Sequence, residues 1–212
     1  MQELLIENRK GFCIKNEKAG KTEFRLFSIA DGDFGAVIDT QLQMRAFEKL
    51  VELGKLPWLT GCRILKRNAQ LKNSLIDYLV ECKGKRILVE DVGTLRAMSL
   101  QKQKIIYVEV KSAALQQNMY AMYPDCPSAR GRKHIRELTE YVKDRGKAII
   151  LFIVALPCVE AFKPNRSADL ELFELLVKAK KTGVKIKSIN IYYNPQDYFI
   201  YLENADLKVK LY

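Results

Sequence analysis

The sequence predicts an α/β protein, α+β overall, in which a small β unit precedes a larger domain built on a mixed sheet. Two observations carry this prediction. Residues 1–38 hold short apolar runs separated by turn residues, whereas residues 148–193 alternate as strand, helix and strand. With 48% apolar residues in a chain of 212, the composition is sufficient for a substantial core. We therefore expect one unit over residues 1–38 and a second over residues 39–212.

The first half of the chain predicts one helix among several strands. Strands are expected at residues 12–14, 24–29, 36–38, 62–67, 74–80 and 86–90. Turns are expected at Asp31-Gly32-Asp33 and at residues 83–85. Asp39-Thr40 can cap a helix that runs to about Leu53, where Gly54 stops it. Residues 92–103 predict a loop.

The second half predicts a strand at residues 105–111, then an irregular stretch to Tyr123, then a helix over residues 128–145. A strand at 148–156, a helix at 168–181 and a strand at 184–193 form a βαβ unit, whose two strands should be parallel. Further strands are expected at residues 198–202 and 207–211, at a sheet edge, where lysines discourage unwanted pairing.

The net charge of +11 is spread along the chain, which favours a folded surface that binds a polyanion. The alternative is a lysine-rich protein of a heat-adapted organism. The longest apolar run, residues 148–156, is too short to span a bilayer, and the first residues do not resemble a signal peptide. We therefore expect a cytoplasmic protein without a membrane partner, and the sequence leaves a homodimer open.

The five cysteines are widely spaced and form no C-x-x-C pair. Such a pattern is typical of buried thiols in a reducing cytosol, with neither a disulfide nor a zinc site. The cysteines are Cys13, Cys62, Cys82, Cys126 and Cys158.

Three charged residues stand in two apolar strands. Glu109 and Lys111 are two residues apart, so they project from one face of the strand at 105–111. Alone, this pair is typical of a solvated strand edge. Asp77, however, is a single carboxylate in an apolar run, and such a group needs a positive partner. Asp77 and Glu109 on neighbouring strands would supply oxygen ligands for Mg²⁺ or Mn²⁺, with Lys111 placed to hold or deprotonate an attacking water.

Basic residues crowd the first turns of the helix over residues 128–145. The helix macrodipole disfavours cations at this end, so the cluster indicates a bound anion such as phosphate. The alternative is that these side chains face water and that His134 is a packed ring. The candidate nucleic-acid-binding residues are Arg130, Arg132, Lys133, His134 and Arg136.

Several motifs together resemble the sugar fermentation stimulation protein A family. They are VEVKS at residues 108–112, YPD at 123–125 and RGxxHxREL at 130–138, supported by SxID at 74–77 and by Asp39-Thr40. The resemblance implies a DNA-binding protein with an OB-like N-terminal domain, here short by a few dozen residues. It also implies a C-terminal domain of the restriction-endonuclease-like type with a PD-(D/E)xK motif.

By this resemblance Asp77, Glu109 and Lys111 fall on the acid, acid and lysine of that motif, and Glu48 of the first helix is a further candidate. The function expected is cleavage of DNA phosphodiesters with Mg²⁺ or Mn²⁺. The alternative is a non-catalytic DNA-binding regulator of sugar metabolism genes. A metabolic enzyme for a small phosphorylated ligand is less favoured, because the sequence contains no glycine-rich phosphate loop.

Overall fold

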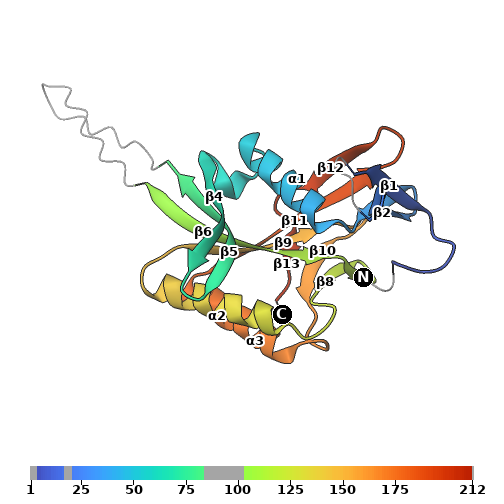
Figure 1. Cartoon of the computed structure of the whole chain (residues 1–212). Coiled ribbons are helices and arrows are strands. Elements are labelled where there is room, and N and C mark those ends of the chain that lie inside the picture. The colour runs from blue at the N-terminus through green and yellow to red at the C-terminus, as the bar shows by residue number, and fades with distance from the viewer. Residues whose placement is uncertain (1–3, 17–20, 84–102, 212) are drawn as a thin grey trace, which may run out of the picture.

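A computed structural model describes residues 4–16, 21–83 and 103–211. Its strands form two sheets, and its helices cover the larger sheet: α1 lies on one face, and α2 and α3 lie together on the other (Figure 1). The helical elements are α1 (Thr40–Glu52), the short 3₁₀ turn η1 (Pro57–Leu59), α2 (Ala129–Lys143) and α3 (Leu170–Thr182). This mixed α/β architecture confirms the predicted α/β class.

The larger sheet has the order β1-β2-β3-β11-β9-β6-β5-β4, and β12 pairs with β11 beside that path. Its strands are β1 (Gly11–Lys15), β2 (Phe24–Asp31), β3 (Phe34–Val37), β4 (Cys62–Leu71), β5 (Ser74–Cys82), β6 (Lys104–Ala113), β9 (Ala148–Val154), β11 (Lys185–Asn194) and β12 (Phe199–Asn204). The expected strand at residues 86–90 lies outside the described residues. So do the hairpin at 83–85 and the loop at 92–103, apart from residues 83 and 103.

Strand β9 is the centre of the fold, and all seven of its residues are buried. It runs parallel to β6 on one side and to β11 on the other. A continuous apolar strand suits this position because helices cover both of its faces. The predicted parallel βαβ unit is therefore confirmed, with α3 as its crossover helix.

The N-terminal strands continue this sheet. The hairpin at Asp31-Gly32-Asp33 joins β2 to β3, as predicted, and β3 pairs with β11 through Gly35 and Tyr193. A Cβ atom at Gly35 would collide with the hydroxyl of Ser28, so only glycine fits this crossing. The division of the chain at residue 38 remains a prediction.

The predicted helix starts are confirmed by their caps. The Asp39 carboxylate accepts hydrogen bonds from the backbone N–H groups of Gln41 and Leu42 at the start of α1. The Ser128 hydroxyl accepts from the N–H of Gly131 at the start of α2. These bonds satisfy N–H groups that have no partner within a helix.

The expectation of an irregular stretch after Lys111 is wrong. Residues 115–123 contain two short strands, β7 (Leu115–Gln117) and β8 (Tyr120–Tyr123), which join β10 (Ala161–Pro164) and β13 (Lys208–Val209) in a second sheet ordered β13-β10-β8-β7. These strands have two to four residues, too few for a clear alternating pattern. The strand expected at residues 207–211 is shorter than predicted, because β13 contains only Lys208 and Val209. It does lie at a sheet edge, as expected.

The expectation for the cysteines is also wrong. Cys62 and Cys82 form a disulfide where β4 begins and β5 ends, with their Cα atoms 3.9 Å apart. The other three thiols, at Cys13, Cys126 and Cys158, are exposed rather than buried. Cross-strand register brings the pair together across 20 residues of sequence, and spacing alone does not reveal it. Within the described ranges, no helix is long and apolar enough to cross a membrane.

Candidate active site

The candidate site lies where β5 and β6 part. The last pair of the β5–β6 ladder is Tyr78 with Val108. The preceding part of β5, residues 74–77, pairs with β4 alone. Beyond this pair, the backbone N–H of Val110 donates to Oδ2 of Asp77, at 2.7 Å, instead of to a neighbouring strand. The side chain of Asp77 thus occupies the gap between the diverging strands.

Glu109 is the most buried charged group of the site, with 1% of the residue exposed. Its Oε1 lies 2.5 Å from Nζ of Lys111 and 2.5 Å from Nδ1 of His134 on α2. Its Oε2 is buried and has no hydrogen-bond partner in the part of the chain that the structure describes. One oxygen of Glu109 is therefore fully engaged while the other is left open, which is costly for a buried carboxylate unless something positive meets it.

The two carboxyl groups differ in acidity. Burial raises the pKa of Glu109, but the hydrogen bond from His134 and the charge of Lys111 outweigh it, so the pKa ends below its usual value. Burial, followed by the charge of Glu109, raises the pKa of Asp77 to about 6, against the opposing hydrogen bond from Val110. Glu109 is thus ionised at neutral pH, whereas Asp77 changes its protonation state only slightly below neutral pH.

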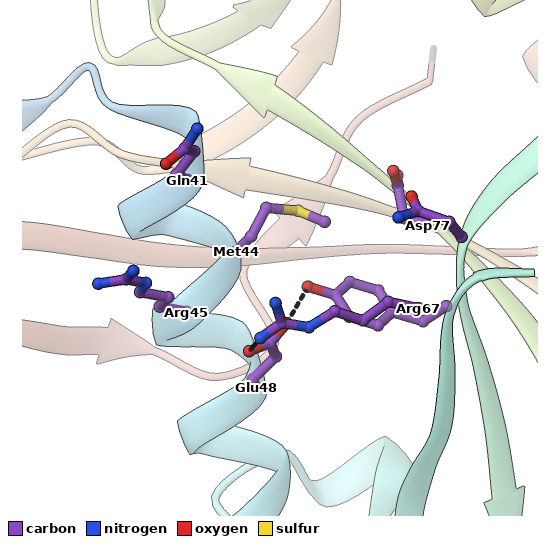
Figure 2. Close-up of a pocket in the computed structure, with 8 residues that line it drawn as sticks. Gln41, Met44, Arg45, Glu48, Arg67 and Asp77 are labelled. Carbon is purple, nitrogen blue, oxygen red and sulfur yellow. Dashed lines mark hydrogen bonds and ion pairs between the residues drawn. The ribbon is translucent and has the colours of Figure 1, made fainter. Parts of the chain in front are cut away.

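Asp77 opens into a pocket of about 240 Å³ beneath α1. Figure 2 shows Asp77 on one side of this pocket and the α1 side chains on the other, with Met44 reaching across toward the strands. The lining residues are Gln41, Met44, Arg45, Glu48, Arg67, Asn68, Asp77 and Tyr78. The pocket therefore gives the carboxyl of Asp77 a route to solvent, whereas Glu109 is not among the lining residues.

Glu48, a candidate from the sequence, lines the same pocket, but both of its oxygens are engaged. The Tyr78 hydroxyl donates to Oε1 at 2.6 Å, and the Arg67 guanidinium forms an ion pair with Oε2. Burial and the bond to Glu48 raise the pKa of Tyr78, which keeps the hydroxyl protonated as a donor. Glu48 therefore links α1 to β4 through Arg67 and to β5 through Tyr78 (Figure 2).

The donor set at Asp77 and Glu109 fits a small divalent cation. The two groups offer carboxylate oxygens, which Mg²⁺ and Mn²⁺ prefer, and Oε2 of Glu109 is a buried acceptor that no described residue satisfies. Within the described residues there is no group of three or more His, Cys, Asp or Glu side chains that could hold a metal. A two-carboxylate site suits Mg²⁺, which keeps several waters when it binds to proteins.

The basic residues predicted to bind nucleic acid are divided by the fold. His134 faces inward to Glu109, whereas Arg132 pairs with Asp169 at 2.8 Å. Asp169 also accepts the N–H of Ser128, at 2.9 Å, so a carboxylate of the chain itself supplies the anion expected at the start of α2. Helix α2 lies on the face of the sheet opposite to α1 (Figure 1).

The remaining members of this set differ in how free they are. Arg136 forms an ion pair with Glu171, and Lys133 donates to the carbonyl of Asn73 at 2.8 Å. Arg130 is exposed and has no hydrogen bond or ion pair with any residue that the structure describes. Of the four arginine and lysine candidates for nucleic-acid binding, Arg130 is thus the one most free to meet a phosphate.

Comparison with known proteins places this arrangement in a family. The family model described as "Sugar fermentation stimulation protein RE domain" matches residues 41–197, most of the chain. The chain belongs to the sugar fermentation stimulation protein family. The resemblance seen in the sequence is therefore confirmed.

Relatives in the sugar fermentation stimulation protein family match nearly the whole chain. The homologue of Pyrococcus furiosus is 41% identical over 202 residues, covering 95% of this chain and 79% of the relative. The homologue of Archaeoglobus fulgidus is 42% identical over 210 residues, covering 99% and 80%. A solved structure described as "The structure of Pyrococcus Furiosus SfsA in complex with Ca2+" superimposes with a TM-score of 0.85 at 39% identity, covering 99% of this chain and 81% of that one.

Sequence reasoning missed part of the site in this sugar fermentation stimulation family member. His134 was expected at a phosphate or as a packed ring, and its contact with Glu109 depends on how α2 packs against β6. The sequence does not predict a site role for Arg67 or Tyr78. The position of Tyr78 directly after Asp77, a charged residue in an apolar run, is the only sequence feature that points to it. Arg67 lies in a polar stretch and has no such feature.

Proposed function

We propose that this chain is a DNA-binding protein that cleaves phosphodiester bonds with Mg²⁺ or Mn²⁺ held by Asp77 and Glu109. The observation that carries the proposal is the buried Oε2 of Glu109, which no described residue satisfies, close enough to the Asp77 carboxyl for the charge of Glu109 to raise the pKa of Asp77. The Ca²⁺ in the Pyrococcus furiosus structure supports a cation site in the family, and the charge of +11 supports a polyanionic substrate. We also propose that the main sheet is restriction-endonuclease-like and that the N-terminal strands are OB-like.

In this proposal the chain's own residues have separate roles. The free oxygens of Asp77 and Glu109 would hold the cation, which supplies Lewis-acid stabilisation of the phosphate when bound. Lys111 donates one hydrogen bond to Glu109 and has two further N–H donors, with which it can orient a water molecule or a phosphate oxygen. His134 holds Glu109 from the opposite element, which fixes the direction of its free oxygen.

The proposal is tested by cleavage of end-labelled DNA in Mg²⁺ or Mn²⁺. Asp77→Asn and Glu109→Gln should abolish cleavage, and Lys111→Met should reduce it by about 100-fold or more, in the range of lost general catalysis. Glu140→Gln is the matched control, because Glu140 is an exposed carboxylate whose ion-pair partner is Lys72. Undiminished cleavage by Asp77→Asn or Glu109→Gln would contradict the assignment.

A second candidate is the non-catalytic DNA-binding regulator. The pairing of Glu109 with both Lys111 and His134 favours it, because that network is balanced in charge without any metal. In this case the wild-type chain should bind DNA with a steep dependence on salt and cut it in neither Mg²⁺ nor Mn²⁺.

A further inference from the structure

The amino ends of three parallel strands meet at one end of the main sheet. Strands β6 and β9 run side by side from Tyr107 and Ala148, and Lys185 of β11 pairs with Ile149 of β9. Because α2 and α3 directly precede β9 and β11 in the chain, both helices end here too. We call the exposed basic residues of this region the basic end; they are Lys104, Arg145, Lys147, Lys180, Lys181 and Lys185.

The basic end carries more positive charge than its surroundings neutralise. In residues 103–106, 143–148 and 180–186, the only acidic residue is Asp144. The carboxyl ends of α2 and α3 each add roughly half a negative elementary charge. Together with Asp144 they offset roughly two of the six positive charges of the basic end. The remaining positive charge suits a polyanion.

Three of these cations surround a hollow of about 370 Å³ between the start of β6 and the end of α2. The side chains of these three residues form no ion pair or hydrogen bond with any residue that the structure describes. Free ammonium and guanidinium groups around one hollow suit phosphate oxygens, which accept several charge-assisted hydrogen bonds. The cations are Lys104, Arg145 and Lys147, and they line the hollow together with Gln103, Tyr141 and Gly146.

The aromatic wall of the hollow is fixed by its neighbours. The ring of Tyr141 lies so close to Gly146 that a Cβ atom on Gly146 would be 2.4 Å from it. Only glycine therefore allows the chain to pass against this ring. The ring also packs edge to face with Tyr107, with centroids 5.0 Å apart and planes 84° apart. A wall that is already ordered loses little entropy when a ligand binds.

Arg145 has an unusual backbone conformation. It follows α2 with a φ of 67°, in the left-handed region that favours glycine. At the end of α3, Gly183 occupies this region. An arginine in such a conformation is less stable than glycine would be, which points to a use for its side chain.

Resting on the DNA binding of the proposed function, but not on cleavage, we infer that the hollow of Lys104, Arg145 and Lys147 binds backbone phosphates of DNA. The positive charge extends beyond the hollow over two helix ends and a further strand, which favours a chain of phosphates over one small phosphorylated molecule.

This contact is separate from the carboxyl pair. The hollow and the Asp77 pocket share no lining residue. Helix α2, which leads into the hollow, lies on the face of the sheet opposite to α1, which lines the Asp77 pocket (Figure 1). The basic end therefore adds affinity for DNA without touching the bond that is cut.

The test is the salt dependence of the binding of the full chain to a fluorescein-labelled duplex, measured by anisotropy in EDTA. Lys104→Gln combined with Lys147→Gln should make the slope of log K against log salt shallower by about two, because each phosphate contact contributes about 0.9. Affinity at about 0.1 M salt should fall by roughly 10- to 100-fold. Lys21→Gln combined with Lys55→Gln is the matched control, because it removes the same charge from exposed lysines outside the basic end and should leave the slope unchanged.

Arg145→Gly separates binding from folding. It should make the slope shallower by about one, while the urea midpoint is no lower than that of wild type, because glycine suits the left-handed backbone. A lower midpoint with an unchanged slope would make Arg145 a structural residue and overturn its part in the contact.

An unchanged slope in the Lys104→Gln, Lys147→Gln variant would overturn the inference, as would an equal change in the control pair. So would binding of AMP that this variant loses while its DNA slope is unchanged, which would make the hollow a pocket for small phosphorylated molecules. In cleavage assays the variant should raise KM for the duplex. A lower kcat with an unchanged KM would place these lysines at the cleaved bond and contradict a separate contact.

Failure of the proposed nuclease is distinguishable, because the binding measurement requires neither metal nor cleavage. A chain that cuts no DNA, but whose slope becomes shallower in the double variant, contradicts the nuclease alone. A chain that cuts DNA, but whose slope is the same in the double variant, contradicts the contact at the basic end alone.

Discussion

Replacing Asp77 by asparagine should make the folded chain more stable at neutral pH while it removes the cation site. The pKa of Asp77 is raised from 3.8 to about 6 by burial and by the charge of Glu109. Because the folded pKa lies above the unfolded one, the folded state holds the proton more tightly, and ionisation above pH 6 opposes folding. The amide oxygen of the new side chain can still accept the N–H of Val110, so the local geometry is retained.

The magnitude follows from the two pKa values. They differ by about two pKa units, each worth about 1.4 kcal/mol, so an ionised Asp77 costs the fold about 3 kcal/mol. Asp77→Asn should therefore raise the free energy of unfolding by up to about 3 kcal/mol at pH 8. The gain should shrink as pH falls through 6 and vanish below about pH 4, where Asp77 is protonated in both states.

The assay is urea unfolding of wild type and Asp77→Asn in EDTA at intervals from pH 4 to pH 8. Glu140→Gln serves as the control, because this exposed carboxylate is not part of the buried pair. A variant that is no more stable than wild type at pH 8, or whose gain is the same at every pH, would refute the reasoning that burial beside Glu109 destabilises the ionised Asp77.

Three further predictions concern the surroundings of the site. Reducing the β4–β5 disulfide, which spans 20 residues of sequence, should lower the free energy of unfolding by about 3 kcal/mol, and an unchanged urea midpoint would argue against it. His134→Ala removes the hydrogen bond that helps lower the pKa of Glu109, so Mn²⁺ affinity should fall most at low pH; a parallel loss at all pH values would indicate a purely structural role. Arg132→Ala breaks the ion pair with Asp169 and should lower the free energy of unfolding by about 1.5–3 kcal/mol. Arg130→Ala should leave the free energy of unfolding unchanged and reduce the salt slope of DNA binding by about one. The opposite pattern would contradict these separate roles of the two arginines.

Local patterns were sufficient to predict much of the fold. The apolar run of β9 and the caps at Asp39 and Ser128 were visible because each depends on neighbours in sequence. Asp77 and Glu109 stood out for the same reason, as charged residues in apolar strands. Their proximity is now explained by the register of β5 and β6, which ends beside them.

Features that depend on long-range packing could not be predicted. The disulfide between Cys62 and Cys82 depends on which residues of β4 and β5 face each other. The basic start of α2 indicated an anion, but not that Asp169, at the start of α3, would supply a carboxylate there. Both cases concern residues far apart in sequence, whose contact is decided by the assembled sheet and helices.

The most direct test of the central claim is a Mn²⁺ titration followed by electron paramagnetic resonance, in which bound Mn²⁺ loses its free-ion signal. Wild type at pH 8 should bind Mn²⁺, and Asp77→Asn and Glu109→Gln should each weaken that binding by about tenfold or more, the effect of removing one charged ligand from a two-carboxylate site. Glu48→Gln should bind nearly as well as wild type, because both oxygens of Glu48 are already engaged by Tyr78 and Arg67. Undiminished Mn²⁺ binding by Asp77→Asn would contradict the assignment of this carboxyl pair as the metal site.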